Sequence, residues 1–275
     1  YAFGETVTQV ADEYSDITFI ALDVGGGDLG DYTLPGNVYC AVYQEELCGY
    51  MAGYAAVKLG YTHLGFLGGM AVPAVVRYGY GFVQGADAAA AETGAAVTVE
   101  YAYGNQFYGD ADITAYMDNW YQTLGVEVVF ACGGGIYSSA AEAAAKVDGK
   151  VIGVDVDQAA IIDDYGKGMT VTSAMKGLAP TTIDTLKGIV AGNWDKYAGK
   201  IQTLGLVSGE DPTLNYVQIP MESTQWADGK FTQDDYKALV KDMFDGKITV
   251  SNDTTKAPTD FATAITVNAQ GQIKG

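Results

Sequence analysis

Basic residues are scarce in this sequence of 275 residues. Fifteen lysines and arginines stand against 34 aspartates and glutamates, which gives a formal net charge of −19, and Arg77 is the only arginine. A protein that binds nucleic acid or an anionic membrane surface needs a positively charged stripe to contact phosphates. The composition therefore excludes nucleic acid as a partner, argues against polyanionic ligands and predicts a strongly hydrated surface.

Cysteine and histidine are scarcer still. The sequence contains Cys40, Cys48 and Cys132, and His63 is its only histidine; it has no C-x-x-C pair and no Cys/His cluster. A structural zinc site or a histidine-based catalytic triad needs more of these side chains than the chain supplies. We predict that Cys40 and Cys132 are buried free thiols, with a Cys40–Cys48 disulfide as the alternative. Neither a metal nor a cofactor is expected.

Long apolar runs are also missing. A membrane-spanning helix needs roughly 18 or more consecutive apolar residues, whereas the longest candidates, such as Val126–Cys132, have the length of a strand. We therefore expect a soluble chain. Its first residues, Tyr1–Gly4, show neither an initiator Met nor a signal sequence, so the localisation must be inferred from other features.

What the sequence does contain is a regular alternation of short apolar runs with helical patterns. The predicted strands are Ile17–Leu22, Val38–Val42, His63–Leu67, Ala96–Tyr101, Val126–Cys132, Val151–Asp155 and Met169–Ala174. The predicted helices are Glu5–Tyr14, Glu45–Leu59, Ala74–Glu92, Asp110–Leu124, Tyr137–Lys146 and Pro180–Ala191. Several strands are continuously apolar, which is typical of parallel sheets covered on both faces. The fold class is therefore predicted to be α/β, built from βαβ units.

The pattern loosens after about Asn193. A short strand is predicted at Leu214–Ile219 and a helix at Gln233–Phe244, with turns rich in Tyr, Gly and Asp around them. The tail, Asp245–Gly275, is polar and carries no predicted element. No internal repeat and no low-complexity linker interrupts the chain.

One glycine-rich stretch imitates a dinucleotide-binding loop. Gly25–Gly30 fits the pattern G-x-G-x-x-G and follows a predicted strand. Such a loop must open a helix whose N-terminus faces the pyrophosphate, whereas here Asp31 follows and Leu34–Asn37 predicts a turn into the next strand. Asp28 and Asp31 would also repel phosphate. We predict a flexible loop rather than a cofactor site.

A second glycine stretch is better placed for binding. Gly133–Gly135 follows the predicted strand Val126–Cys132 and precedes the helix from Tyr137. Glycines at the carboxyl end of a parallel strand allow a ligand to approach the backbone amides closely. The alternative interpretation is a tight strand-to-helix turn without a ligand.

Charged side chains follow several predicted strands. Asp23, Asp155 and Lys176 each stand where an apolar run emerges. No nucleophile, histidine or metal cluster accompanies them, so acid–base catalysis is poorly supported. A carboxylate that accepts two hydrogen bonds from a vicinal diol fits better, at roughly 1.5–3 kcal/mol for each charge-assisted bond. The alternative is that these residues cap loops or pair with one another.

An aromatic side chain could complete such a site. Phe107 stands in the loop Tyr103–Tyr108, after a predicted strand. An exposed loop aromatic can stack on a flat ring, which contributes about 1–3 kcal/mol. The alternative is that Phe107 packs beneath its own loop.

These positions coincide with a resemblance to a known family. The stretch Leu64–Ala86 (LGFLGGMAVPAVVRYGYGFVQGA) resembles the signature of the BMP (basic membrane protein) family, whose members include nucleoside-binding lipoproteins of ABC importers. Val129–Gly135, Val151–Gln158 and Thr172–Gly177 continue the resemblance in the family's order. It covers most of the chain from Phe3 to about Tyr236.

The resemblance implies a type I periplasmic-binding-protein fold: two Rossmann-like lobes joined by a hinge, with a purine nucleoside held between them. Lobe one is expected to comprise residues 1–42 and 173–275, and lobe two residues 43–172. The residues expected to bind the ligand are Asp23, Asn105, Phe107, Gly133, Gly134, Asp155 and Lys176. The resemblance implies that Asp155 and Lys176 bind the ribose and that Phe107 is one of two stacking aromatics. Asp23 and Lys176 are expected on lobe one and the others on lobe two.

One departure from the family pattern stands out. Family members begin with a βαβα segment that supplies base-reading residues and the second aromatic, and Tyr1–Phe3 aligns with the end of a later strand. We therefore expect an N-terminal extension of about 60–80 residues in the intact protein, which corresponds to roughly two βα units.

The resemblance also implies partners and a location. Guanosine, inosine or adenosine is the expected ligand and an ABC permease the protein partner, for a monomer that lies outside the cytoplasm, at the cell surface or in the periplasm. Membrane attachment is expected only through a lipid anchor outside this chain. The alternatives are a sugar or riboflavin as ligand, a nucleoside-processing enzyme that uses Asp155 and Lys176, and a repressor core, which the acidic composition disfavours.

Overall fold

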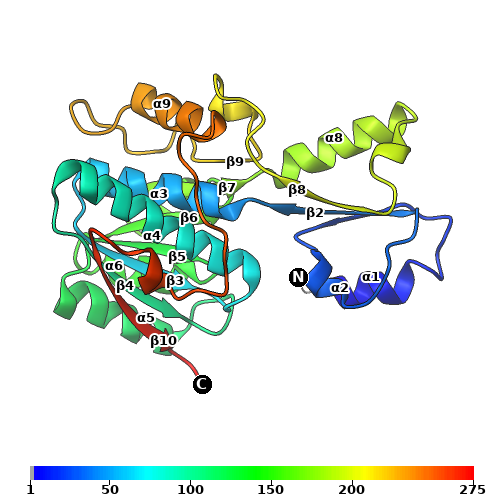
Figure 1. Cartoon of the computed structure of the whole chain (residues 1–275). Helices are drawn as coiled ribbons and strands as arrows, with labels where there is room; N and C mark the ends of the chain where they lie inside the picture. The colour runs from blue at the N-terminus through cyan, green and yellow to red at the C-terminus, as the bar shows by residue number, and fades with distance from the viewer. Residues whose placement is uncertain (1–2) are drawn as a thin grey trace. The chain divides into compact units, whose positions relative to one another are not determined.

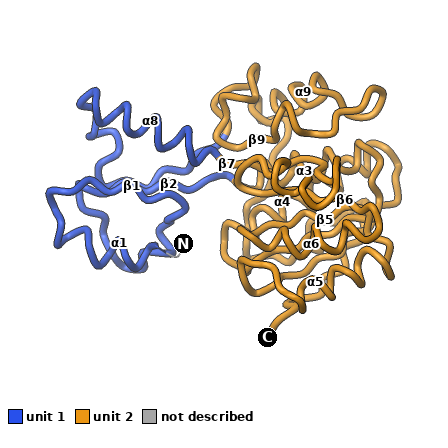
Figure 2. Tube along the Cα trace, turned by 180° about the vertical axis from the view of Figure 1, so that it is seen from behind, with its two compact units in different colours: residues 1–44, 177–205 blue, residues 45–176, 206–275 orange. Residues whose placement is uncertain are grey.

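The computed structural model describes residues 3–275, which form two compact units (Figure 2). Unit 1 contains the chain up to Gln44 together with Gly177–Gly205, and unit 2 contains Glu45–Lys176 together with Leu206–Gly275. Among the described residues, no helix has the length and apolar character that a membrane span requires.

Unit 1 is built on a small parallel sheet. Its three strands, β1 (Phe19–Leu22), β2 (Val38–Tyr43) and β8 (Lys200–Leu204), lie in the order β1-β2-β8. The helices of this unit are α1 (Gly4–Val10), α2 (Gly26–Leu29) and α8 (Leu178–Val190), with a 3-10 turn at Trp194–Lys196. Its core is a cluster of small and branched side chains: Val7, Ala11, Val24, Leu29, Val38 and Cys40.

Unit 2 contains a larger sheet with the strand order β10-β4-β3-β5-β6-β7-β9. These strands are β3 (His63–Gly68), β4 (Thr98–Tyr103), β5 (Val128–Cys132), β6 (Lys150–Asp155), β7 (Thr170–Lys176), β9 (Val217–Gln218) and β10 (Thr266–Gln272). All neighbouring strands run parallel except β7 and β9, which pair antiparallel.

The helices of unit 2 lie on both faces of this sheet (Figure 1). The helices of this unit are α3 (Glu45–Leu59), α4 (Pro73–Thr93), α5 (Ala111–Asp118), which continues into a π-helical turn at Asn119–Leu124, α6 (Tyr137–Ala144), α7 (Ala159–Ile162) and α9 (Gln233–Phe244). Two 3-10 turns, Pro212–Leu214 and Pro258–Phe261, accompany them.

The two faces of the sheet carry different side chains. Because successive residues of a strand point to opposite faces, Phe66 contacts Phe82 of α4 while its neighbour Leu67 belongs to the cluster formed with α5 and α6. Phe130, the register partner of Phe66 on β5, joins the aromatic face. This double burial explains why β3 and β5 are apolar without interruption.

Helices α3 and α4 approach each other through glycines. A Cβ atom on Gly49 would lie 2.3 Å from the carbonyl oxygen of Tyr78, and one on Gly81 would lie 2.0 Å from that of Glu46. Gly53 and Gly85 make equivalent contacts one turn further on. A helix pair packed at this distance admits no side chain at these positions, so the two GxxxG spacings form a close backbone interface.

The α/β class with parallel sheets is confirmed, and the elements missed by the sequence analysis are the polar or short ones. Strands β8 and β10 are largely solvent-exposed, so they carry no apolar run that would reveal them. The prediction that the Gly25–Gly30 stretch opens no helix was wrong, because α2 forms one turn there. The carboxylate of Asp28 accepts a hydrogen bond from the amide of Gly25 (2.8 Å), so a carboxylate of the chain itself lies at the N-terminus of that turn.

The compact units also differ from the expected lobes. Residues 206–275 were assigned to lobe one, but they belong to unit 2, since β9 pairs with β7 and β10 pairs with β4. Lys176 was expected on lobe one as well. It ends β7, which is hydrogen-bonded to β6, and so lies in the same unit as Asp155.

The glycine interface generates a stability prediction. We expect Gly81→Ala to lower the free energy of unfolding by about 2–4 kcal/mol, because the added methyl would overlap a backbone carbonyl that cannot move independently of α3. Gly27→Ala is the control, since a Cβ there meets no atom within 4 Å. Thermal unfolding followed by circular dichroism should show a clear drop in Tm for the first variant alone. Equal Tm values would contradict the role given to the glycine contact.

Candidate functional site

The candidate site lies at the carboxyl ends of the parallel strands of unit 2. Strands β3, β5, β6 and β7 end consecutively at Gly68, Cys132, Asp155 and Lys176, and they are neighbours in the sheet. This edge of an α/β sheet is where such folds bind ligands, because the loops that follow the strands present free backbone amides and side chains there.

Asp155 and Lys176 form the charged centre of the site. The ammonium of Lys176 lies 3.2 Å from Oδ1 of Asp155, with 5% of the lysine side chain and 34% of the aspartate side chain exposed. Asp155 has a left-handed backbone (φ 68°), a conformation that Asn and Asp adopt more readily than most residues. The carboxylate is therefore held at the strand end by a buried cation while it stays accessible.

Tyr78 of α4 contacts both members of this ion pair. Its hydroxyl donates a hydrogen bond of 3.4 Å to Oδ1 of Asp155, and the Lys176 ammonium lies 5.9 Å from the centre of its ring. Burial raises the pKa of Tyr78 well above its ordinary value, so the hydroxyl stays a donor at any physiological pH. Oδ1 of Asp155 thus contacts both the Tyr78 hydroxyl and the Lys176 ammonium.

A second ionic group lies beside the first. Nε of Arg77 is 2.7 Å from Oε2 of Glu45 and 4.0 Å from Oε2 of Glu46, and both glutamates are almost fully buried at the start of α3. Oε1 of Glu45 and Oε2 of Glu46 have no hydrogen-bond partner among residues 3–275. The positive end of the α3 dipole and Arg77 together offset part of the cost of burying two carboxylates.

The pKa values of the two glutamates reflect this burial. Desolvation raises the pKa of Glu45, although the nearby Arg77 and Lys176 act in the opposite direction. Desolvation raises the pKa of Glu46 to about 7, and the charge of Glu45 adds to the increase. Glu46 is therefore expected to take up a proton near neutral pH.

The aromatic element of the site is Phe107. Its ring packs against the backbone of Gly69 and Gly133: an added Cβ would lie 2.5 Å from Cδ1 of the ring at Gly69 and 3.1 Å from it at Gly133. The carbonyl of Phe107 accepts a hydrogen bond from the amide of Gly135 (2.8 Å), and Gly134 between them has a positive φ of 53°. Glycines are needed here because the Phe107 loop closely covers this part of the backbone.

Asn105 and Asp23 complete the set of expected residues. Asn105 stands at the start of the Phe107 loop with a left-handed backbone (φ 62°), and its amide donates to the carbonyl of Gly69 (3.0 Å). Asp23 follows β1 in unit 1, also with a left-handed backbone (φ 59°), and its amide donates to the carbonyl of Ala41 (2.8 Å). The structure thus brings Asn105, Phe107, Gly133, Gly134, Asp155 and Lys176 to one sheet edge of unit 2, whereas Asp23 belongs to unit 1.

Sequence reasoning missed four members of the cluster: Glu45, Glu46, Arg77 and Tyr78. A single arginine in a strongly acidic chain was the available signal for Arg77. Nothing local to the sequence connects it with Glu45, 32 residues earlier, or with Asp155 at the end of another strand. The three cysteines are free and buried, as predicted for Cys40 and Cys132.

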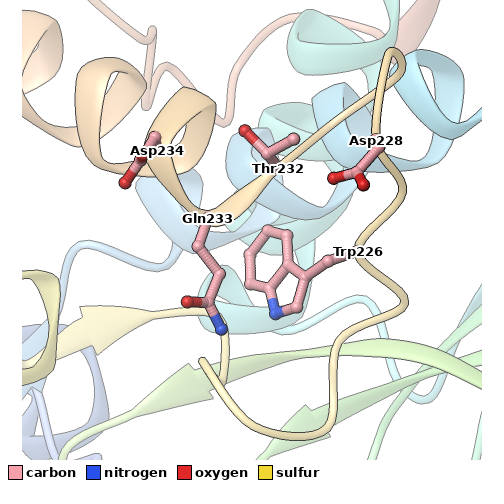
Figure 3. Close-up of a pocket in the computed structure, with 5 residues that line it drawn as sticks. All are labelled: Trp226, Asp228, Thr232, Gln233 and Asp234. Carbon is pink, nitrogen blue, oxygen red and sulfur yellow. The ribbon is translucent and has the colours of Figure 1, made fainter.

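A separate concave pocket of about 520 Å³ lies elsewhere in unit 2 (Figure 3). It is lined by Trp226, Asp228, Thr232, Gln233 and Asp234. The amide nitrogen of Gln233 and the indole nitrogen of Trp226 both donate to the carbonyl of Met221, so these donors are already engaged. None of the expected ligand-binding residues lines this pocket.

Comparison with known proteins identifies relatives. Residues 1–210 match the Bmp family model, described as ABC transporter substrate-binding protein PnrA-like. Basic membrane protein B of Borreliella afzelii is 29% identical over 212 residues, which cover 76% of this chain and 59% of that protein. The ABC transporter nucleoside-binding protein BmpA of Lactococcus lactis is 32% identical over 131 residues, which cover 44% of this chain and 36% of that protein.

Among solved structures, a solute-binding protein of an ABC transporter system from Aeropyrum pernix is similar, with a TM-score of 0.63 and 20% identity over 95% of this chain and 72% of that chain. This likeness shows the fold, the predicted type I periplasmic-binding-protein architecture. The chain spans about 59% of the length of the first curated relative, and the family match ends at residue 210, short of the expected Tyr236.

The raised pKa of Glu46 has a measurable consequence. Protonated Glu46 is favoured in the folded state, so its contribution to stability is complete below pH 4.5 and is lost as the pH rises through 7. From pH 5 to 8 the free energy of unfolding of the wild type should fall about 2–3 kcal/mol more than that of Glu46→Gln, which cannot ionise. Denaturant titrations at each pH measure this difference, with the exposed Glu222→Gln as control. Parallel pH profiles for wild type and Glu46→Gln would show that Glu46 does not titrate in this range.

Proposed function

This chain belongs to the Bmp family of PnrA-like ABC transporter substrate-binding proteins, and from that membership we propose that it binds a purine nucleoside for delivery to an ABC importer. Guanosine, inosine and adenosine are the candidate ligands. Because the chain covers only part of its curated relatives, the ligand and the permease partner rest on the site described above together with the name of the Lactococcus relative.

The observation that carries the proposal is the accessible carboxylate of Asp155 beside the buried ammonium of Lys176. The contacts to Lys176 and Tyr78 are both made by Oδ1 of Asp155, which leaves Oδ2 to accept from a ligand. A vicinal diol offers two donors and, through its oxygen atoms, acceptors for the ammonium. A ribose therefore matches both charges of the pair at once.

The position of Phe107 supports a ring next to that sugar. Its ring lies against Gly133 at the end of β5, and Asp155 ends the adjacent strand β6. Adjacent strands are about 4.8 Å apart, so the aromatic face and the carboxylate stand roughly one to two strand spacings apart. A base joined directly to a ribose covers a distance of that kind. The prediction that Asp23 adds a polar contact stays a prediction.

The proposal also covers what happens to the bound ligand and where the protein is located. The ligand is released unchanged, since the family and the fold are those of solute-binding proteins. The proposed location is outside the cytoplasm, with a lipid anchor beyond this chain, and the proposed state is a monomer. Incubation with guanosine followed by chromatography of the recovered ligand tests the first point, because any conversion would favour the enzyme alternative.

Asp155 provides the direct test. Asp155→Ala should weaken purine nucleoside binding about 30- to 1000-fold, a loss of about 2–4 kcal/mol, because two charge-assisted hydrogen bonds disappear and the diol is left unpaired. Asp155→Asn keeps the shape but weakens the acceptor, so its affinity should fall between the two. A 2′-deoxynucleoside should bind the wild type more weakly and lose less on mutation. Isothermal titration calorimetry measures all three proteins.

Asp148 supplies a matched control. It also has a left-handed backbone (φ 55°) and pairs with a lysine, Lys150 (3.6 Å), but it precedes β6 instead of following it. Asp148→Ala should therefore reproduce any backbone effect of the substitution and leave the affinity within about twofold of the wild type. Equal affinities for Asp155→Ala and wild type would reject the ribose assignment. Binding of riboflavin or a free sugar in place of every purine nucleoside would reject the ligand class.

A further inference from the structure

The C-terminal strand of this chain lies next to the loop that carries Phe107. Strand β10 pairs in parallel with β4, and the amide of Ile273 continues the pairing by donating to the carbonyl of Tyr103 (2.8 Å). Tyr103 is the last residue of β4, and the Phe107 loop follows it directly. The family match ends at residue 210, so this strand lies outside the matched part of the chain.

Beyond β10, the side chain of Lys274 reaches the far end of the same loop. Its ammonium forms an ion pair with Oδ2 of Asp110 and lies 3.5 Å from Oδ2 of Asp112. Asp110 is the N-cap of α5: its Oδ1 accepts hydrogen bonds from the amides of Asp112 (3.1 Å) and Ile113 (3.0 Å). Both oxygens of Asp110 are thereby engaged, one by the helix and one by the C-terminal tail.

Gln106 connects this ion pair to Phe107. Its side-chain amide donates to Oδ2 of Asp110 (2.9 Å) and to the carbonyl of Tyr108 (2.9 Å). The two residues that flank Phe107 are therefore joined to each other and to Asp110. Lys274 and Gln106 contact the same oxygen of Asp110, so the three residues form one network beside Phe107.

We propose that Lys274 is a positioning residue for ligand stacking, which holds the loop of residues 104–110 so that the Phe107 ring stays against Gly69 and Gly133. The assignment rests on the proposed function insofar as Phe107 stacks on a ligand ring. The loop restraint itself is independent of any ligand. Strand β10, Ile273 and Lys274 together then form a latch that restrains this loop.

The charges of the latch persist across the physiological pH range. The hydrogen bond from Lys274, with those from the α5 backbone, lowers the pKa of Asp110 to about 2, and Asp110 in turn raises the pKa of Lys274. Both groups are therefore charged at neutral pH. Because both side chains are partly solvent-exposed, the ion pair contributes little to the free energy of unfolding. Its role is to hold the loop of residues 104–110 in place.

Lys274→Met in the full chain tests the restraint without a ligand. Hydrogen exchange of the backbone amides of residues 104–110 should accelerate about threefold or more, while the amides of α3 and α4 keep their rates, because only the local opening of the loop becomes easier. Lys274→Arg should preserve slow exchange. Lys247→Met is the matched control, since Lys247 is an exposed lysine of the polar tail that lies outside the latch. It pairs with Asp242 (2.6 Å) and is distant in sequence from the loop.

Binding supplies the second measurement. Lys274→Met should weaken guanosine or inosine binding about three- to tenfold in a protein that carries Phe107, and by less than about twofold in the Phe107→Leu background, because the two residues act through one ring. Unchanged exchange rates in Lys274→Met, or equal losses in both backgrounds, would overturn the proposal. If the wild type binds no purine nucleoside, the proposed function fails, and the exchange rates still decide whether the restraint exists.

Discussion

The close contact of α3 and α4 is the constraint on which the candidate site depends. Gly81 lies against the carbonyl of Glu46, and Gly49 lies against that of Tyr78. The backbones of the two helices are therefore in contact next to the polar residues of the site. This distance brings Arg77 next to Glu45 and places the Tyr78 hydroxyl under Asp155. A side chain at any of these glycines would separate the partners and leave buried charges uncompensated.

The site is an exception to the charge distribution of the molecule. A chain with a net charge of −19 hydrates most of its carboxylates, yet the start of α3 buries two of them. Arg77 and Lys176 offset that cost, and each also contributes to a fixed geometry: Arg77 orients Glu45, and Lys176 orients Asp155. Buried ion pairs of this kind add little net stability, because the cost of desolvating both charges offsets their attraction.

The segment after residue 210 extends the fold without entering the family match. It supplies both edge strands of the large sheet, β9 and β10, and so covers the hydrogen-bonding edges that β7 and β4 would otherwise expose. At one of these edges it also reaches the loop before α5 through Lys274. A segment outside the family match thus completes the sheet and contacts a loop of the matched part.

The sequence by itself determined the α/β class, most elements from β1 to α8 and the family, because apolar periodicity and local motifs are properties of neighbouring residues. It also identified Asp155 and Lys176 as residues at strand ends and Phe107 as a residue of the loop after a strand. Only the tertiary structure decided that Lys176 shares a unit with Asp155, that Glu45 and Arg77 lie beside them, and that the polar strand β10 exists. Those facts depend on strand order and helix packing, which join residues far apart in the chain and leave no periodic trace in it.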